Sequence, residues 1–295
     1  MADIKEMVAK KASEIDAIIE KYLPAEEGYA KTVLEAMNYS IHVGGKRLRP
    51  MLMREVYEMF GGQSGVIEPF MAAIEMIHTY SLVHDDLPAM DNDEYRRGQK
   101  STHAKYGHAM GILAGDGLLN YAFETALKAY DIKPDAGVVR ALKVLADKAG
   151  VNGMIGGQVV DVESEGQPVN MDVIKYIHEN KTAAMIESSM MIGAILAGAS
   201  DEEIEIIETI GSDVGLAFQI RDDILDVTST LEVLGKPIGS DEKNNKTTYV
   251  SLVGLEQAEK DVEAVSVRAL DNLKALSVEN DFLTELIRML ITRNS

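Results

Sequence analysis

Apolar residues recur every three or four positions along most of the 295-residue chain. This spacing places them on one face of an α-helix. It is clearest over residues 67–82, 113–130 and 204–225. Alternating apolar and polar runs, which would indicate β-strands, are scarce, and no turn sequence signals a β-hairpin. The pattern therefore predicts an all-α fold of roughly ten or more helices.

Residues that break helices separate these periodic segments. Glycines follow several of them, at Gly61, Gly150 and Gly198, and prolines interrupt others, at Pro24 and Pro134. No linker rich in proline and serine divides the chain, and no repeat of solenoid length is found. We therefore expect a single domain over residues 1–295.

Two segments, residues 85–107 and 235–248, interrupt the helical pattern with dense charge and glycine. Long polar loops in a compact helical domain are often functional. Each of these segments follows an Asp-Asp pair at the end of a predicted helix. Candidate functional residues are therefore sought first around these two pairs.

The composition narrows the range of functions. The chain carries a net charge of −19 and contains no cysteine. Without cysteine, a disulfide scaffold, a thiolate metal site and a cysteine nucleophile are excluded. The strong negative charge argues against a nucleic-acid partner. Because neither a signal peptide nor a membrane span is recognisable, we expect a soluble, cytoplasmic protein.

The first acidic cluster comprises Asp85, Asp86, Asp91 and their neighbours, at the end of the helix that begins near Ile67. Pro88 disfavours continuation of the helix, so Asp91 can fold back towards Asp85. Hard carboxylate oxygens at this density suit Mg²⁺, which binds one or two carboxylates together with water and phosphate oxygens.

The second acidic cluster contains Asp222, Asp223 and Asp226. Asp222 and Asp226 are four residues apart and share one helix face, where like charges repel unless a cation lies between them. Acidic residues near helix ends are often only solvated surface charges. Two such clusters at the ends of strongly apolar helices make a metal site the better interpretation.

Basic residues are few, and several accompany these clusters. They are Lys46 and Arg49 in the sequence GGKRLRP, His78 two helical turns before Asp85, Arg96 and Arg97 after the first cluster, Lys181 beside Thr182, and Lys236 and Lys246 in the second loop. Each alone would be interpreted as a surface cation or a packed core histidine. Acidic metal sites with cations beside both of them suit a diphosphate ligand.

The sequence resembles the trans (E-type) prenyl diphosphate synthase family over nearly its whole length. Seven segments match in order and spacing: GGKRLRP at 44–50, EMIHTYSLVHDDLPAMDND at 75–93, RRG at 96–98, GQ with an aspartate at 157–161, KT at 181–182, FQIRDDILD at 218–226 and GKPIGSDEKNNKTTY at 235–249. The resemblance implies an isoprenoid synthase fold, a bundle of long helices around a deep central cavity, usually as a homodimer.

The resemblance also implies roles for individual residues. Asp85, Asp91, Asp222 and Asp226 would bind Mg²⁺, with three ions expected, and Asp86 would support them. The residues implied for the allylic diphosphate are Arg96, Lys181, Lys236 and Lys246, and those for isopentenyl diphosphate are Lys46, Arg49, His78 and Arg97. Thr182 and Gln219 would lie near the allylic C–O bond.

Product length is expected to depend on Tyr80, five residues before Asp85 and about 7.5 Å from it along a helix. A ring there could form the floor of the pocket for the growing chain, and it could equally be ordinary core packing. Tyr80 followed by Ser81 resembles the bacterial farnesyl (C15) type, so a C15 product is expected, with geranylgeranyl (C20) as the alternative.

Three other functions are compatible with parts of the pattern. A terpene cyclase would leave the GGKRLRP turn and His78 unexplained. A non-catalytic subunit of a longer-chain synthase would usually lack some of the aspartates, and none is missing. A plain acidic helical binding protein would need neither aspartate cluster for its function.

Overall fold

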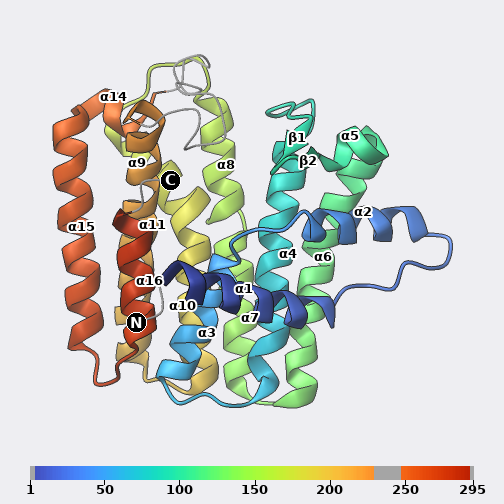
Figure 1. The fold of residues 1–295 in the computed structure, drawn as a ribbon, viewed down its shortest axis with the longest axis horizontal. Coiled ribbons are helices and arrows are strands. Elements are labelled where there is room, and N and C mark those ends of the chain that lie inside the picture. Colours follow the sequence, from blue (N-terminus) through green and yellow to red (C-terminus); the bar gives the residue numbers. More distant parts are fainter. Residues whose placement is uncertain (1–3, 229–246, 293–295) are drawn as a thin grey trace. The chain divides into compact units, whose positions relative to one another are not determined.

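The computed structural model describes residues 4–228 and 247–292, which fold into helices and one short hairpin (Figure 1). More than ten α-helices occur among these residues, so the expected all-α architecture is confirmed. None of the described helices is both long enough and apolar enough to cross a membrane. Contacts group the chain into two compact units: unit 1 is Met1–Arg54 with Gln63–Leu142, and unit 2 is Glu55–Gly62 with Lys143–Ser295.

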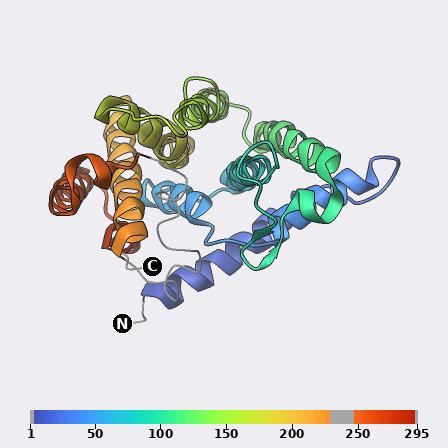
Figure 2. The same ribbon diagram turned by 90° about the horizontal axis from the view of Figure 1, so that it is seen from above.

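Unit 1 is built around one buried helix, α4 (Glu68–Asp85), which runs beside α6 (His108–Ile132) (Figure 1, Figure 2). Twelve of the 18 residues of α4 are buried, which is typical of a helix packed on several sides. The remaining elements are α1 (Ile4–Glu20), α2 (Lys31–His42), the start of α3 (Leu48–Met59), the 3₁₀ turn η1 (Gly65–Ile67), strands β1 (Tyr95–Arg96) and β2 (Gln99–Lys100), α5 (Thr102–Tyr106) and the start of α7 (Ala136–Ala149).

The hairpin of β1 and β2 was not expected from the sequence. Tyr95 pairs with Lys100, and Arg97 and Gly98 form the turn with φ angles of 52° and 77°. Positive φ at both central residues characterises the type I′ turn that matches the twist of paired strands. The strands have only two residues each, too few to produce an alternating pattern.

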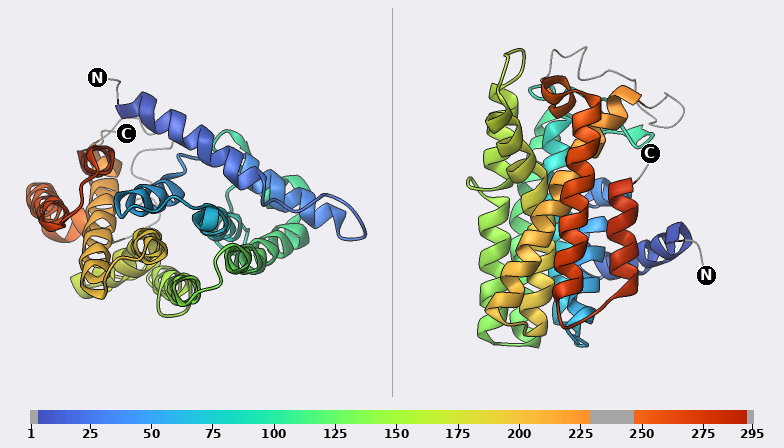
Figure 3. Two further views of the ribbon diagram at one scale, coloured as in Figure 1. Left: turned by 90° about the horizontal axis from the view of Figure 1, so that it is seen from below. Right: turned by 90° about the vertical axis from the view of Figure 1, so that its left-hand side faces the viewer.

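Unit 2 contains the end of α3, the second half of α7 and the helices that follow: α8 (Met154–Glu163), α9 (Met171–Ile177), the π-helical segment η2 (His178–Ala183), α10 (Ala184–Ala197), α11 (Asp201–Thr228), α14 (Tyr249–Val253), α15 (Leu255–Ala275) and α16 (Asp281–Thr292). The helices α9, η2 and α10 follow one another without a break. Long α11 contacts both α10 and α15, and Figure 3 shows α15 beside it.

Two glycines let neighbouring helices approach the backbone of η2. A Cβ atom at Gly157 of α8 would lie 2.2 Å from the backbone nitrogen of Lys181. A Cβ atom at Gly215 of α11 would lie 2.4 Å from the Cα of Ala183. Because neither glycine has a side chain, α8 and α11 can lie close to η2, and this determines where Lys181 and Thr182 lie relative to them. Single π-helical turns occur frequently at functional sites.

Candidate active site

The first aspartate cluster forms where α4 ends. The helix stops at Asp85, and the chain turns back so that the backbone N–H of Asp91 donates to the carbonyl of Asp85 at 2.9 Å. Pro88 lies within this turn, as the sequence analysis expected. The fold-back brings the backbones of the two expected metal ligands together, although they are six residues apart in sequence.

Asp86 differs from its neighbours because it is 2% exposed and paired with an arginine. Arg96 of β1 donates to the Asp86 carboxylate from Nε at 2.8 and 3.0 Å and from Nη2 at 2.6 Å. Burial lowers the pKa of the Arg96 guanidinium, but its bonds to Asp86 and the nearby carboxylates raise the pKa overall. Arg96 therefore stays charged beside the cluster, and Asp86 holds it in place.

Cationic side chains lie around His78 in unit 1, and Arg49, Arg97 and their neighbours Arg47 and Arg96 form this cationic cluster. Gly45 packs so closely against Arg97 that a Cβ atom there would lie 2.7 Å from the guanidinium nitrogen Nη1. The Nε of Arg49 is buried and has no hydrogen-bond partner among the described residues. Burial, followed by the charges of Arg49, Arg97 and the arginines at 96 and 47, holds the pKa of His78 well below 6.5. His78 is therefore neutral at pH 7, beside cations suited to an anion.

Lys46 occupies an exposed position in the segment just before α3, and Arg49 lies in the first turn of that helix. Tyr80 is 6% exposed, and its ring meets His84 edge to face at 5.7 Å. Burial and the charge of Asp85 raise the pKa of Tyr80 to about 12. The hydroxyl of Ser81 donates to the carbonyl of His78 at 2.9 Å.

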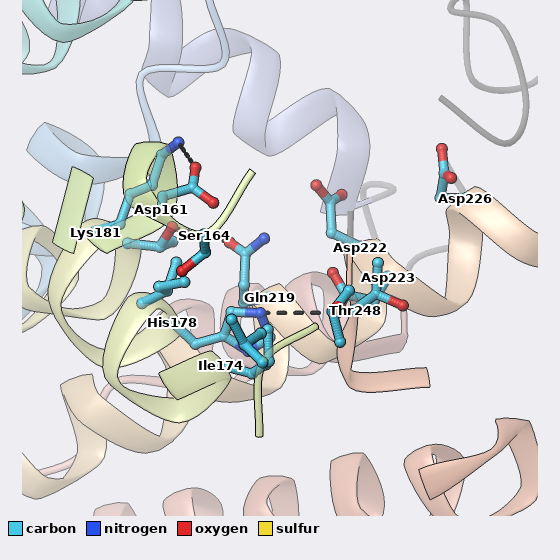
Figure 4. A pocket seen from close by; sticks show the side chains of 14 residues that line it. Asp161, Ser164, Ile174, His178, Lys181, Gln219, Asp222, Asp223, Asp226 and Thr248 are labelled. Carbon is cyan, nitrogen blue, oxygen red and sulfur yellow. Dashed lines mark hydrogen bonds and ion pairs between the residues drawn. The ribbon is translucent and has the colours of Figure 1, made fainter. Parts of the chain in front are cut away.

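The second aspartate cluster lines a cavity of about 240 Å³ within unit 2 (Figure 4). Its lining combines carboxylates, one lysine and several hydroxyl and amide groups from α8, η2, α11 and the residues just before α14. The polar members are Asp161, Ser164, His178, Lys181, Thr182, Gln219, Asp222, Asp223, Asp226, Thr247 and Thr248. The cavity therefore brings together five residues predicted from the sequence: Lys181, Thr182, Gln219, Asp222 and Asp226.

Two interactions orient the π-helical residues. Lys181 donates from Nζ to Asp161 Oδ2 at 2.6 Å, and Thr182 donates from Oγ1 to Gln219 Oε1 at 2.9 Å. Asp161 is only 5% exposed. The hydrogen bond between Thr182 and Gln219 joins two residues that the resemblance implied near the allylic C–O bond; that role stays a prediction.

Asp223 has a role that the sequence analysis did not assign. Its Oδ2 accepts a hydrogen bond from the backbone N–H of Tyr249 at 2.8 Å and lies 3.7 Å from Nε2 of His178. The His178 and Tyr249 rings stack with centroids 6.2 Å apart. Asp223 thereby ties the start of α14 to α11, while Asp222 and Asp226, one turn apart, line the cavity (Figure 4).

His178, Ser164 and Thr248 also line this cavity without having been singled out from the sequence. Asp161 belonged to a matched segment but received no role. Asp161 could have been selected from its place in that segment, three positions after Gln158. Nothing in the sequence around His178 distinguishes it from a core histidine. Lys236 and Lys246, expected to hold a diphosphate, lie outside the described residues.

The donor set fits Mg²⁺ in its oxygen chemistry. In both aspartate clusters the candidate ligands are carboxylates, and the chain contains no cysteine that could supply a thiolate. Over residues 4–228 and 247–292, no three acidic or histidine side chains converge closely enough to enclose a metal ion by themselves. Mg²⁺ commonly binds through one or two carboxylates plus water and substrate phosphates, so a partial protein cage is consistent with it.

Comparisons with known proteins agree with these features. The polyprenyl synthetase family matches residues 30–280. The chain is 39% identical over 292 residues to farnesyl diphosphate synthase of Geobacillus stearothermophilus, covering 99% of this chain and 98% of that protein. It is 40% identical to a chloroplastic large subunit of heterodimeric geranylgeranyl pyrophosphate synthase from Arabidopsis thaliana, covering 97% and 78%.

Among solved structures, the chain is similar to a geranyltransferase from Helicobacter pylori complexed with magnesium and isoprenyl diphosphate. The TM-score is 0.84 at 32% identity, and the match covers 99% of this chain and 97% of that one. The helical fold, the two aspartate clusters and these full-length matches lead to one conclusion: the chain belongs to the polyprenyl synthetase family.

Proposed function

We propose that this protein joins isopentenyl diphosphate head to tail to allylic diphosphates, first dimethylallyl and then geranyl diphosphate, to form farnesyl diphosphate. The cationic cluster around His78 is the observation that carries the proposal. A reaction between two diphosphates needs a diphosphate site separate from the aspartate clusters. Arg49, Arg97 and neutral His78 supply the donors that such a site needs.

The reaction begins with departure of diphosphate from the allylic carbon. Mg²⁺ held by Asp85, Asp91, Asp222 and Asp226 would neutralise the developing charge on the leaving group. In unit 1, Arg96 pairs with Asp86 next to Asp85. In unit 2, Lys181 pairs with Asp161 in the cavity that Asp222 and Asp226 line. Each adds fixed positive charge, which counts for more where water is excluded. Both cations are held by buried aspartates, so little reorganisation is needed when the substrate binds.

The allylic carbon becomes positively charged as its C–O bond breaks. The hydroxyl of Thr182 and the side chain of Gln219 lie 2.9 Å apart and present oxygen atoms that can stabilise this charge. The double bond of isopentenyl diphosphate then attacks this carbon, and loss of a proton completes the new double bond. Exclusion of water prevents the carbocation from forming an alcohol.

A C15 product is proposed because Tyr80 is a buried ring one and a half turns before Asp85. A C20 product is the alternative, since the Arabidopsis relative is a geranylgeranyl pyrophosphate synthase subunit. A terpene cyclase is disfavoured because it would leave the cationic cluster around His78 unexplained. A non-catalytic subunit is disfavoured because all the expected aspartates are present.

A homodimer is proposed from the surface of α6. Five large apolar side chains on this helix are each about half exposed: Ile112, Leu113, Leu127, Tyr130 and Ile132. Leu113 and Leu127 are about four helical turns apart, and Ile112 and Tyr130 are five turns apart, so each pair shares a face. An exposed apolar surface of this kind is typical of a protein interface. A cytoplasmic location stays a prediction from composition.

The test is incubation of the purified protein with isopentenyl diphosphate, dimethylallyl diphosphate and Mg²⁺, followed by chain-length analysis of the dephosphorylated products. We expect farnesol, and no product with EDTA. Asp222→Asn should lower the rate by about 10²-fold or more, because charge stabilisation in the transition state is lost. Asp271→Asn, on an exposed side chain of α15, is the matched control. Absence of product from every allylic primer would refute the proposal.

A further inference from the structure

A buried carboxylate lies close to the cationic cluster of unit 1. Glu75 on α4 is 2% exposed and one helical turn before His78, so the two share a helix face. Its Oε1 accepts a hydrogen bond from Nη1 of Arg47 at 2.7 Å. A buried charge is stable only when paired, and Glu75 is paired with an arginine that is itself 4% exposed.

Each of the three guanidinium nitrogens of Arg47 donates a hydrogen bond inside the protein. Besides the bond to Glu75, its Nε donates to Asp16 Oδ1 at 2.7 Å and its Nη2 donates to the carbonyl of Ile41 at 2.8 Å. All three guanidinium nitrogens are therefore used inside the protein. The contacts connect α1, α2 and α4 to the short turn that carries Arg47. The role of this arginine is to hold that turn.

The backbone at Arg47 needs such anchoring. Its φ angle is +50°, a left-handed conformation that side chains other than glycine rarely adopt. Such a conformation persists where the surrounding contacts enforce it. Lys46 precedes this residue and Arg49 follows two positions later. If Arg47 lost its anchor, both cations would lose their present orientation.

Glu75 also acts on the other cations of the cluster. Burial, together with neighbouring arginines, lowers the pKa of both Arg49 and Arg97, and the negative charge of Glu75 opposes this shift in each. Asp16 cannot replace Glu75 in this role, since its side chain is 53% exposed and more strongly screened by water. Glu75 is therefore the buried counter-charge around which the cations assemble.

We propose that Glu75 is a positioning residue: its buried carboxylate anchors Arg47 and thereby holds Lys46 and Arg49 in the conformation that binds the diphosphate of the isopentenyl substrate. The inference rests on the proposed function, since that function assigns isopentenyl diphosphate to the cationic cluster around His78. Glu75 does not touch the substrate, and it determines how strongly isopentenyl diphosphate binds.

The test compares Glu75→Gln with the unchanged protein in steady-state kinetics with each substrate varied in turn. Removal of the charge should raise KM for isopentenyl diphosphate by about tenfold and leave KM for the allylic substrate and kcat within about twofold. Titration calorimetry with isopentenyl diphosphate alone should show a similar rise in Kd. Glu75→Asp keeps the charge with a shorter reach and should give a smaller rise.

Glu187→Gln is the matched control. Glu187 is another buried glutamate, 7% exposed, and pairs with Lys148 in unit 2. The Glu187→Gln substitution should reduce the melting temperature without raising KM for isopentenyl diphosphate. If Glu75→Gln does not fold, the KM and Kd of Glu75→Asp for isopentenyl diphosphate test the proposal instead.

The proposal is overturned if the Glu75 variants keep the original KM for isopentenyl diphosphate, or if both substrates are affected equally. Failure of the proposed function would be distinct, since the unchanged protein would then form no product.

Discussion

Substitution of Gly157 by alanine tests whether the close approach of α8 to the π-helical segment is needed for activity. The added Cβ atom would lie 2.2 Å from the backbone nitrogen of Lys181 and 2.8 Å from the carbonyl carbon of Asn180. Both are backbone atoms, so no side-chain rotation can relieve the overlap. The segment that carries Lys181 and Thr182 must move relative to α8.

The size of the displacement follows from these distances. Real Cβ atoms essentially never lie within 3.0 Å of another heavy atom, so the gap to Lys181 must widen by at least 3.0 − 2.2 = 0.8 Å. Overpacking of this kind costs about 1–3 kcal/mol of stability. For a chain of this size, that corresponds to a fall of roughly 2–5 °C in Tm. A shift of about 1 Å in a group that contacts the substrate can reduce the rate by about 10²-fold.

The assay measures kcat with isopentenyl and dimethylallyl diphosphates, together with thermal melting. Gly65→Ala is the matched control, because a Cβ atom at Gly65 would meet no atom within 4 Å. It introduces the same methyl group in open space and should preserve both Tm and kcat. If Gly157→Ala also retained the original kcat and Tm, the backbone contact between α8 and the π-helical segment would not be what positions Lys181.

Three further predictions concern product length, assembly and pH. Tyr80→Ala should extend the main product beyond C15, as shown by chromatography of the dephosphorylated products; an unchanged C15 product would show that Tyr80 is ordinary core packing. Leu127→Arg, at a 52% exposed position on α6, should convert a dimer into a monomer in light scattering, and an unchanged mass would exclude this face as the interface. The pKa of His78 is lower in the folded protein than in the unfolded chain, so below pH 6.5 the unfolded chain binds a proton that the folded protein does not. The free energy of unfolding must therefore decrease as the pH falls through that value. Urea titrations without ligands at pH 7.5 and 5.5 should show a smaller decrease for His78→Gln, and equal decreases would contradict the neutral histidine.

Local sequence patterns were sufficient for the helices and for several site residues. The three- and four-residue spacing predicted the long helices because one face of each must be buried. Pro88 predicted the turn that brings Asp91 back to Asp85, and the four-residue spacing placed Asp222 and Asp226 on one face. These features depend on residues close together in sequence, so periodicity and backbone preferences reveal them.

Pairings between distant residues were decided by the tertiary structure. Glu75 and Arg47 are 28 positions apart, and Lys181 and Asp161 are 20 apart. Asp223 reaches the backbone of Tyr249 over 26 positions, although it stands beside a predicted metal ligand in the same motif. Helix periodicity specifies which face of a helix is buried, but it does not specify which charged side chains of different helices form pairs. Packing determines these partners, since a buried charge must find an opposite charge wherever the fold places one.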